Sequence, residues 1–165
     1  MRLINREDPD IIKLLEERGL IEEDIQLSVE GGLSEQRFYY DRTNRDLIVI
    51  RKRFEYLSIY VKLHLDRDTD SAEILSAYSH KAGFASDQPG FIETRNLSGT
   101  EKESNWICGR CEVPVLKVKD IVPCYEEYEF PAVRGLRCQT CSFEMFDETM
   151  VVVEFTAAEE MMEGK

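Results

Sequence analysis

The sequence predicts an α+β fold: an N-terminal helical hairpin with a small antiparallel sheet, followed by a β module with a C-terminal helix. Two observations support this prediction. Apolar residues recur at helical spacing near the N-terminus and then give way to β-branched and aromatic runs. Four of the five cysteines fall as two CxxC pairs in the second half of the chain. With 165 residues, 42% of them hydrophobic, the chain can form one ordinary domain or two small ones.

The first helix is predicted between Asp8 and Gly19. Asp8 is a suitable N-cap, Pro9 suits the first helical position, and Gly19 can adopt the left-handed conformation that ends a helix. A second, short helix is predicted from about residue 21 to 29, where apolar residues recur every four positions. The glycine pair at 31–32 is expected to end it. The two helices together would form a helical hairpin.

Four strands are predicted after the helices, because β-branched and aromatic residues dominate each run. They span residues 38–40, 47–50, 57–63 and 74–78. A small sheet needs an apolar layer on one face to be stable. We therefore expect the two helices to back this sheet.

A linker is predicted at residues 83–104, because Gly, Pro, Ser and Asn occur there at turn-forming density. The expected organisation is an α+β module of unknown role at 1–82, this linker, and a cysteine-bearing module with a C-terminal helix at 105–165. His64 and His80 in the first module lack a second histidine or an acidic pair at metal-ligand spacing. The sequence therefore predicts no catalytic or cofactor-binding residue, and the role of His80 stays open.

The two CxxC pairs predict a metal site. Two residues between cysteines let a tight turn aim both sulfur atoms at one ion, and two such turns complete a tetrahedral shell of four thiolates. The expected ligands are Cys108, Cys111, Cys138 and Cys141. The segment between the pairs exceeds the commonest spacing of about 15 to 20 residues, and we expect a hairpin of residues 113–118 with 128–133 to fill it. Cys124 has no CxxC partner and is expected to pack as a small apolar residue.

Four thiolates suit both zinc and iron. Rubredoxin-type turns usually have glycine after the second cysteine, where the backbone is left-handed, but Glu112 and Ser142 occupy those positions here. A non-glycine residue rarely adopts a positive φ. This departure favours a zinc ribbon over a rubredoxin-like iron site.

The segment from Trp106 through the four cysteines to the acidic C-terminal helix resembles a family of short CxxC/CxxC proteins, described as redox or zinc-ribbon proteins. Their genes lie beside those of molybdenum- or tungsten-dependent aldehyde oxidoreductases in anaerobic prokaryotes. The similarity covers about 60 residues, from 105 to 165. It implies that the four cysteines are metal ligands and that the partner is such an oxidoreductase or one of its maturation factors.

The last segment is predicted to contain a strand at residues 150–155 and then a helix. Thr156 with Glu159 three residues later has the pattern of a capping box, and residues 157–163 are good helix formers. Met161 and Met162 are expected to pack onto the ribbon or the neighbouring module rather than to dock a partner.

The charge balance limits the possible partners. The chain carries 33 acidic and 21 basic residues, a formal net charge of −12, which repels nucleic acid and anionic membranes. No apolar run approaches the roughly 20 residues that cross a bilayer, and the N-terminus lacks the apolar core of a signal peptide, so a cytoplasmic protein is expected. The sequence therefore favours a non-enzymatic zinc-ribbon accessory protein that binds another protein. The alternative is a rubredoxin-like electron carrier with iron in the same site.

Overall fold

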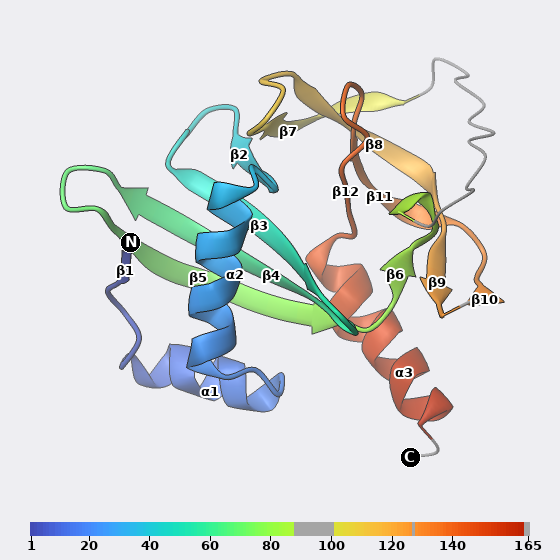
Figure 1. Ribbon diagram of the computed structural model, residues 1–165, viewed down its shortest axis with the longest axis horizontal. Helices are drawn as coiled ribbons and strands as arrows, with labels where there is room; N and C mark the ends of the chain where they lie inside the picture. Colours follow the sequence, from blue (N-terminus) through green and yellow to red (C-terminus); the bar gives the residue numbers. More distant parts are fainter. Residues whose placement is uncertain (88–100, 127, 164–165) are drawn as a thin grey trace.

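The computed structural model describes residues 1–87, 101–126 and 128–163. In these ranges nine strands form one sheet in the order β1-β5-β4-β3-β2-β7-β8-β11-β12 (Figure 1). A second sheet has the order β10-β9-β6. The strands of the large sheet are β1 (Arg2–Leu3), β2 (Phe38–Asp41), β3 (Leu47–Phe54), β4 (Leu57–Asp66), β5 (Ser71–His80), β7 (Lys102–Cys108), β8 (Pro114–Ile121), β11 (Val133–Cys138) and β12 (Glu144–Met145). Those of the second sheet are β6 (Gly83–Phe84), β9 (Pro123–Tyr125) and β10 (Tyr128–Glu129). The helices are α1 (Pro9–Glu17), α2 (Glu22–Ser34), a π-helix (Met150–Phe155) and α3 (Thr156–Met162), with a 3₁₀ turn at Ala85–Asp87.

The predicted fold class is wrong, because one large sheet runs through both halves of the chain. The four predicted strands correspond to β2 to β5, but β2 pairs with β3 on one side and with β7 on the other. Tyr39 lies opposite Val49 of β3 and opposite Cys108 of β7. Periodicity locates strands but does not show which distant strands pair. The N-terminal strands and the cysteine-bearing strands therefore belong to one sheet, where the sequence indicated a small sheet and a separate ribbon.

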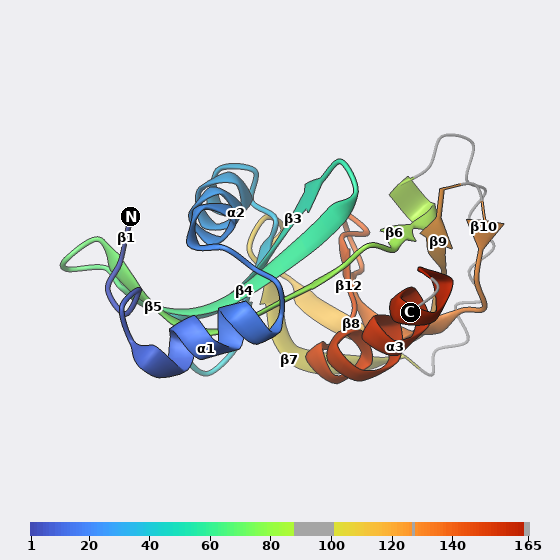
Figure 2. The same ribbon diagram turned by 90° about the horizontal axis from the view of Figure 1, so that it is seen from below.

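The predicted helical hairpin is also wrong. α2 crosses the face of β3 and β4, whereas α1 lies beside β5 at the edge of the sheet, and the two helices run in different directions (Figures 1 and 2). Arg18, just after α1, donates to the carbonyl of Ala77 on β5 (2.6 Å). The predicted ends of α1 are confirmed, since the Asp8 side chain accepts the N–H of Asp10 (2.9 Å) and Gly19 has a φ of +65°. Each helix thus covers part of the sheet instead of pairing with the other helix.

The glycine pair at 31–32 does not end the second helix, which continues to Ser34. A Cβ at Gly32 would lie 1.9 Å from Cγ2 of Ile50 on β3. A Cβ at Gly31 would meet only the flexible end of Lys52, whose Cε would be 3.1 Å away. Gly32 therefore allows the helix backbone to approach the sheet closely, and this requirement for space explains the glycine better than a helix stop.

The C-terminal segment is helical where a strand is predicted. The π-helix and α3 are continuous, and the buried side chains of the π-helix recur at helical spacing: Met150, Val151 and Phe155. The predicted capping box is wrong, because Thr156 lies inside the helix and its hydroxyl donates to the carbonyl of Val151 (3.1 Å). Asp147 caps the helix instead by accepting the N–H of Met150 (2.7 Å). Within the described residues, no helix is long and apolar enough to cross a membrane.

The strands around the cysteines pair differently from the prediction. β8 lies between β7 and β11, and Tyr128–Glu129 pair with β9 instead of with β8. Of the predicted linker, residues 88–100 lie outside the described residues, while its flanks form β6, the 3₁₀ turn and the start of β7. The division into modules at 1–82 and 105–165 stays a prediction.

One apolar cluster joins both halves of the chain. Tyr39, Val49 and Tyr60 from the N-terminal strands pack in the same cluster as Cys108 and Cys138. A second cluster lies under the two N-terminal helices, around Ile25, Ile50 and Leu63. The cysteines therefore lie beside a core that the N-terminal strands help to build.

The different surroundings of the two glycines give a testable pair of substitutions. Gly32→Ala should lower the free energy of unfolding by about 1–3 kcal/mol, because the added methyl group overlaps Ile50. Gly31→Ala, the matched control, should leave stability unchanged or raise it by up to about 1 kcal/mol, because alanine favours a helix and Lys52 can move. Urea denaturation measures both, and equal effects of the two substitutions would contradict this role for Gly32.

Candidate metal centre

The two CxxC turns have the same backbone structure. The first follows β7 and the second follows β11. The N–H of Glu112 donates to the carbonyl of Cys108 (2.9 Å), and the N–H of Ser142 donates to that of Cys138 (3.0 Å). After each turn the chain folds back, so that Cys138 donates its own N–H to the carbonyl of Phe143 (2.9 Å). Two equivalent turns therefore present their cysteines from neighbouring parts of one sheet.

The residue after the second cysteine of each turn adopts a left-handed conformation although it is not glycine. Glu112 has a φ of +56° and Ser142 a φ of +66°. Glu112 and Ser142 therefore adopt the conformation that glycine usually supplies, and the prediction that they disfavour a rubredoxin-type turn is wrong. The surrounding strands hold a backbone conformation that is unfavourable for the isolated residues.

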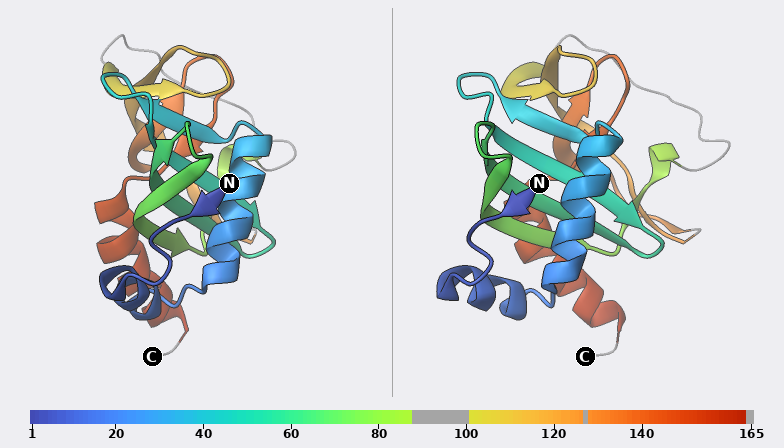
Figure 3. Two further views of the ribbon diagram at one scale, coloured as in Figure 1. Left: turned by 90° about the vertical axis from the view of Figure 1, so that its left-hand side faces the viewer. Right: turned by 60° about the vertical axis from the view of Figure 1, so that its left-hand side comes forward.

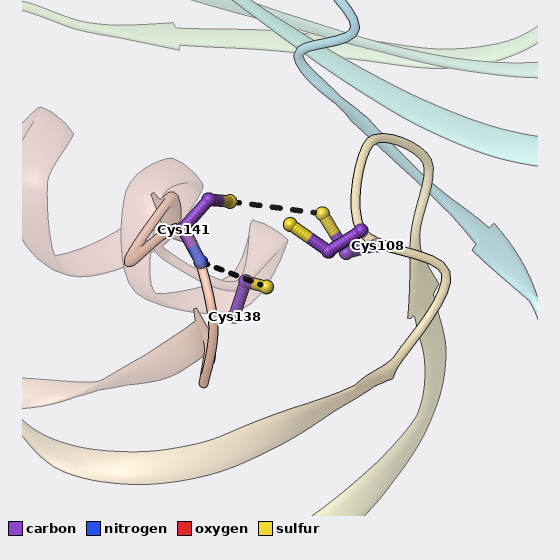
Figure 4. Close-up of side chains that lie close together, drawn as sticks. Cys108, Cys138 and Cys141 are labelled. Carbon is purple, nitrogen blue, oxygen red and sulfur yellow. Dashed lines mark hydrogen bonds between the residues drawn. The ribbon is translucent and has the colours of Figure 1, made fainter.

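The four sulfur atoms form a group of the right size for a metal ion. All of them lie within 4.8 Å of one another. The sulfur atoms of Cys108 and Cys141 are 3.8 Å apart, and Figure 4 shows them turned toward each other. A metal–sulfur bond of about 2.3 Å in a tetrahedron requires sulfur atoms about 3.8 Å apart. The group can therefore hold a metal ion with little movement of the side chains.

The environment of the thiols differs between the inner and outer cysteines. Cys108 and Cys138 are buried, whereas Cys111 and Cys141 are partly exposed. Burial raises the pKa of Cys108 to about 12 and that of Cys111 to about 11. Burial also opposes ionisation of Cys138, but the N–H groups of Cys141 and Thr140 donate to its sulfur and lower its pKa overall. A metal ion that binds near neutral pH must therefore displace protons from Cys108 and Cys111.

Tyr39 connects the two turns. Its backbone pairs with that of Cys108, and its hydroxyl donates to the carbonyl of Phe143, which also accepts the N–H of Cys138. The Tyr39 side chain is fully buried, and burial raises its pKa well above the usual value, so the hydroxyl keeps the proton that it donates. The carbonyl of the preceding Phe38 accepts the N–H of Gly109 (2.9 Å) in the first turn. β2 thus fixes the position of one turn relative to the other.

Two arginines place positive charge beside the second turn. The guanidinium carbons of Arg37 and Arg51 lie 4.9 Å and 4.6 Å from the centre of the Phe143 ring. Arg51 is buried and also lies over Phe84 (4.0 Å). Burial lowers the pKa of Arg51 from its usual value, but a guanidinium stays protonated in proteins. Both guanidinium groups therefore pack against the ring of the residue that follows the second turn.

His80 is not part of the four-cysteine group and has a structural role. It is buried, its Nδ1 bonds the carbonyl of Ala82 (2.8 Å), and its Nε2 bonds the hydroxyl of Tyr60 (3.0 Å). The same hydroxyl accepts the N–H of Phe146 (3.1 Å). Donation from Nδ1 leaves Nε2 as the acceptor of the Tyr60 proton. His80 therefore links β5 to the segment that follows the second turn.

The other two residues considered from the sequence, His64 and Cys124, lie outside the site. His64 is exposed on β4, and Cys124 is buried in β9 outside the four-cysteine group. Sequence reasoning missed Tyr39 and Arg51 as neighbours of the site. Both residues lie in strands whose sequences are typical of a buried core, so their residue types do not indicate a site. The pairing of β2 with β7 also cannot be predicted from either segment alone.

Comparison with known proteins finds a similarity in the second half of the chain and assigns no activity. Residues 104–165, which include all four cysteines of the group, are similar to the family "Domain of unknown function (DUF7479)". The chain matches no curated protein and no solved structure.

The Tyr39 hydroxyl offers a direct test of the link between the turns. Tyr39→Phe should weaken metal binding by about 10- to 100-fold, the usual effect of removing a group that orients a ligand. Tyr40→Phe on the same strand is the matched control and should bind as the wild type does. Competition with a coloured chelator measures the affinity, and circular dichroism checks the fold. Equal affinities for the wild type and Tyr39→Phe would contradict the role of the hydroxyl.

The buried His80 predicts a loss of stability in mild acid. Burial, followed by the charge of Arg51, lowers the pKa of His80 to about 3 in the folded protein, whereas the unfolded chain titrates near 6.5. The unfolded state therefore binds the proton first, and stability falls as the pH drops below about 6.5. Between pH 7 and 5.5, His80→Gln should lose about 1 kcal/mol less than the wild type. The exposed His64→Gln is the control, and an unchanged pH dependence in His80→Gln would refute the assignment.

Proposed function

We propose that this protein is a non-enzymatic metal-binding accessory protein, in which one zinc ion holds the two CxxC turns together. The observation that supports this proposal is that four sulfur atoms lie within 4.8 Å of one another. Four thiolates fill a tetrahedral shell and leave no open position for a substrate, as in structural zinc sites. In this proposal the ion stabilises the fold and performs no reaction.

The accessory role follows from the charge of the chain and from its resemblance to the short CxxC/CxxC proteins. A net charge of −12 disfavours nucleic acid and anionic lipid as partners. We propose a protein partner, and the resemblance implies that this partner is a molybdenum- or tungsten-dependent oxidoreductase or one of its maturation factors. A thiolate site is most stable in a reducing compartment, so we place the protein in the cytoplasm.

A rubredoxin-like electron carrier is the second candidate, and a specific observation supports it. Glu112 and Ser142 adopt the left-handed conformation of rubredoxin-type turns. The N–H groups of Thr140 and Cys141 also lie 3.4 Å and 3.5 Å from the sulfur of Cys138. Such bonds tune the reduction potential of an iron–thiolate site. The partly exposed Cys111 and Cys141 would bring the site near the surface for electron transfer.

The metal content decides between the two proposals. Protein purified anaerobically without added metal should contain one zinc ion per chain and show no visible absorption. Iron with a coloured ferric–thiolate spectrum would support the electron carrier instead. Absence of both metals would contradict both proposals.

A pair of cysteine substitutions tests the assignment of the ligands. Cys138→Ser should lose the ion and most of the cooperative unfolding transition, because metal binding contributes directly to the stability of small metal sites. Cys124→Ser is the matched control, since Cys124 is also buried but lies outside the group. It should keep the metal. Elemental analysis and thermal unfolding give the result, and metal retention by Cys138→Ser would show that the ligand set is wrong.

A further inference from the structure

The C-terminal helix presents an uncovered apolar face. Met161 is 77% exposed, Met162 is 53% exposed and Val153 is 60% exposed. Ala157 and Ala158, four residues before the two methionines, are exposed as well. This contradicts the expectation that the methionines pack onto the ribbon. These five residues, Val153, Ala157, Ala158, Met161 and Met162, are called the α3 outer face below.

The opposite side of the same helix is firmly attached to the protein. Phe155 packs edge-on against Phe146, with ring centres 4.7 Å apart. Glu159 accepts the hydroxyl of Tyr125 (2.9 Å) and the N–H of Lys81 (2.8 Å). α3 lies on the other side of the sheet from α2, as Figure 3 shows, and extends away from the strands toward the C-terminus in Figure 1. The α3 outer face is therefore held in a fixed position and faces away from the core.

We propose that the α3 outer face binds a basic amphipathic helix of a partner protein. The apolar residues recur at helical spacing, and the two alanines let a second helix approach to the usual axial distance of about 8–10 Å. The methionines are flexible and adapt to the side chains of a partner. This inference rests on the protein-binding part of the proposed function and names the surface and the chemistry of the partner.

The negative charges around the α3 outer face favour a basic partner. Glu154 and Glu160 border it, and among the described residues no cation forms an ion pair with either of them. A second copy of the chain would bring the same carboxylates together across a two-fold axis. Anionic lipid would be repelled in the same way. Lysine or arginine beside the apolar residues of a partner helix would instead complement these carboxylates.

The test uses a synthetic peptide of leucine and lysine, with leucine on one helical face and a length of about four turns. Fluorescence anisotropy measures its binding to the metal-loaded protein. A peptide of the same composition, with leucine spread around the helix, controls for simple charge attraction. The wild type should bind the amphipathic peptide more tightly than the scrambled one, and the affinity should fall as salt rises.

Two sets of variants locate the binding face. The double variant Met161→Ser/Met162→Ser should bind the peptide at least about tenfold more weakly, because two apolar contacts are lost. Glu154→Gln/Glu160→Gln should weaken binding and reduce its salt dependence. Tyr56→Ser is the matched control, since Tyr56 is 72% exposed elsewhere on the surface, between β3 and β4. It should bind as the wild type does.

Equal affinity of the wild type and Met161→Ser/Met162→Ser would overturn the proposal. So would a wild-type dimer in analytical ultracentrifugation that becomes a monomer in this variant, because a second copy would then occupy the face. Elemental analysis of the same samples separates this proposal from the metal site. A protein that contains zinc but does not bind the peptide at α3 would refute only the docking surface. A protein that binds the peptide through α3 but contains no metal would refute only the zinc proposal.

Discussion

The pairing of β2 with β7 is the interaction on which the rest of this structure depends. It sets Tyr39 opposite Cys108, and through the Tyr39 hydroxyl it also reaches the carbonyl of Phe143 in the second turn. A fully buried hydroxyl needs a partner, so the position of the second turn is constrained by the N-terminal half of the chain. Without this pairing the sheet would separate between β2 and β7. The two turns would then lose the contacts with β2 that both of them share.

The four-cysteine group is consequently integrated into the core. Zinc ribbons commonly compensate for a core that is too small, with the ion replacing apolar contacts. In this protein Cys108 and Cys138 belong to the same apolar cluster as Tyr39, Val49 and Tyr60. His80 and Tyr60 extend the connection to Phe146, which supports the C-terminal helix. Side chains from both halves therefore connect the four-cysteine group to the N-terminal strands, and a metal bound there would be coupled to the folding of these strands.

Local features could be predicted from the sequence, and long-range pairing could not. The cap at Asp8, the left-handed Gly19 and the approach of the four cysteines follow from residue types and short spacings. The helix through residues 150–155 was missed because its β-branched valines favour a strand when taken alone, whereas the burial of Met150 and Phe155 decides the outcome. The glycine pair alone indicates a helix end, whereas the residue that requires a glycine at position 32 is Ile50, eighteen residues away along the chain. The pairing of β2 with β7 produces no recognisable pattern in the sequence of either strand.

Hydrogen–deuterium exchange with and without the metal tests the central claim, that the metal centre and the N-terminal strands form one cooperative unit. Removal of the metal by a chelator should speed the exchange of backbone amides in the two turns and also in β2 (Phe38–Asp41) and β3 (Leu47–Phe54). Faster exchange is expected to reach β2 and β3 because β2 supports both turns. Faster exchange confined to residues 102–145, with unchanged protection of β2 and β3, would contradict it.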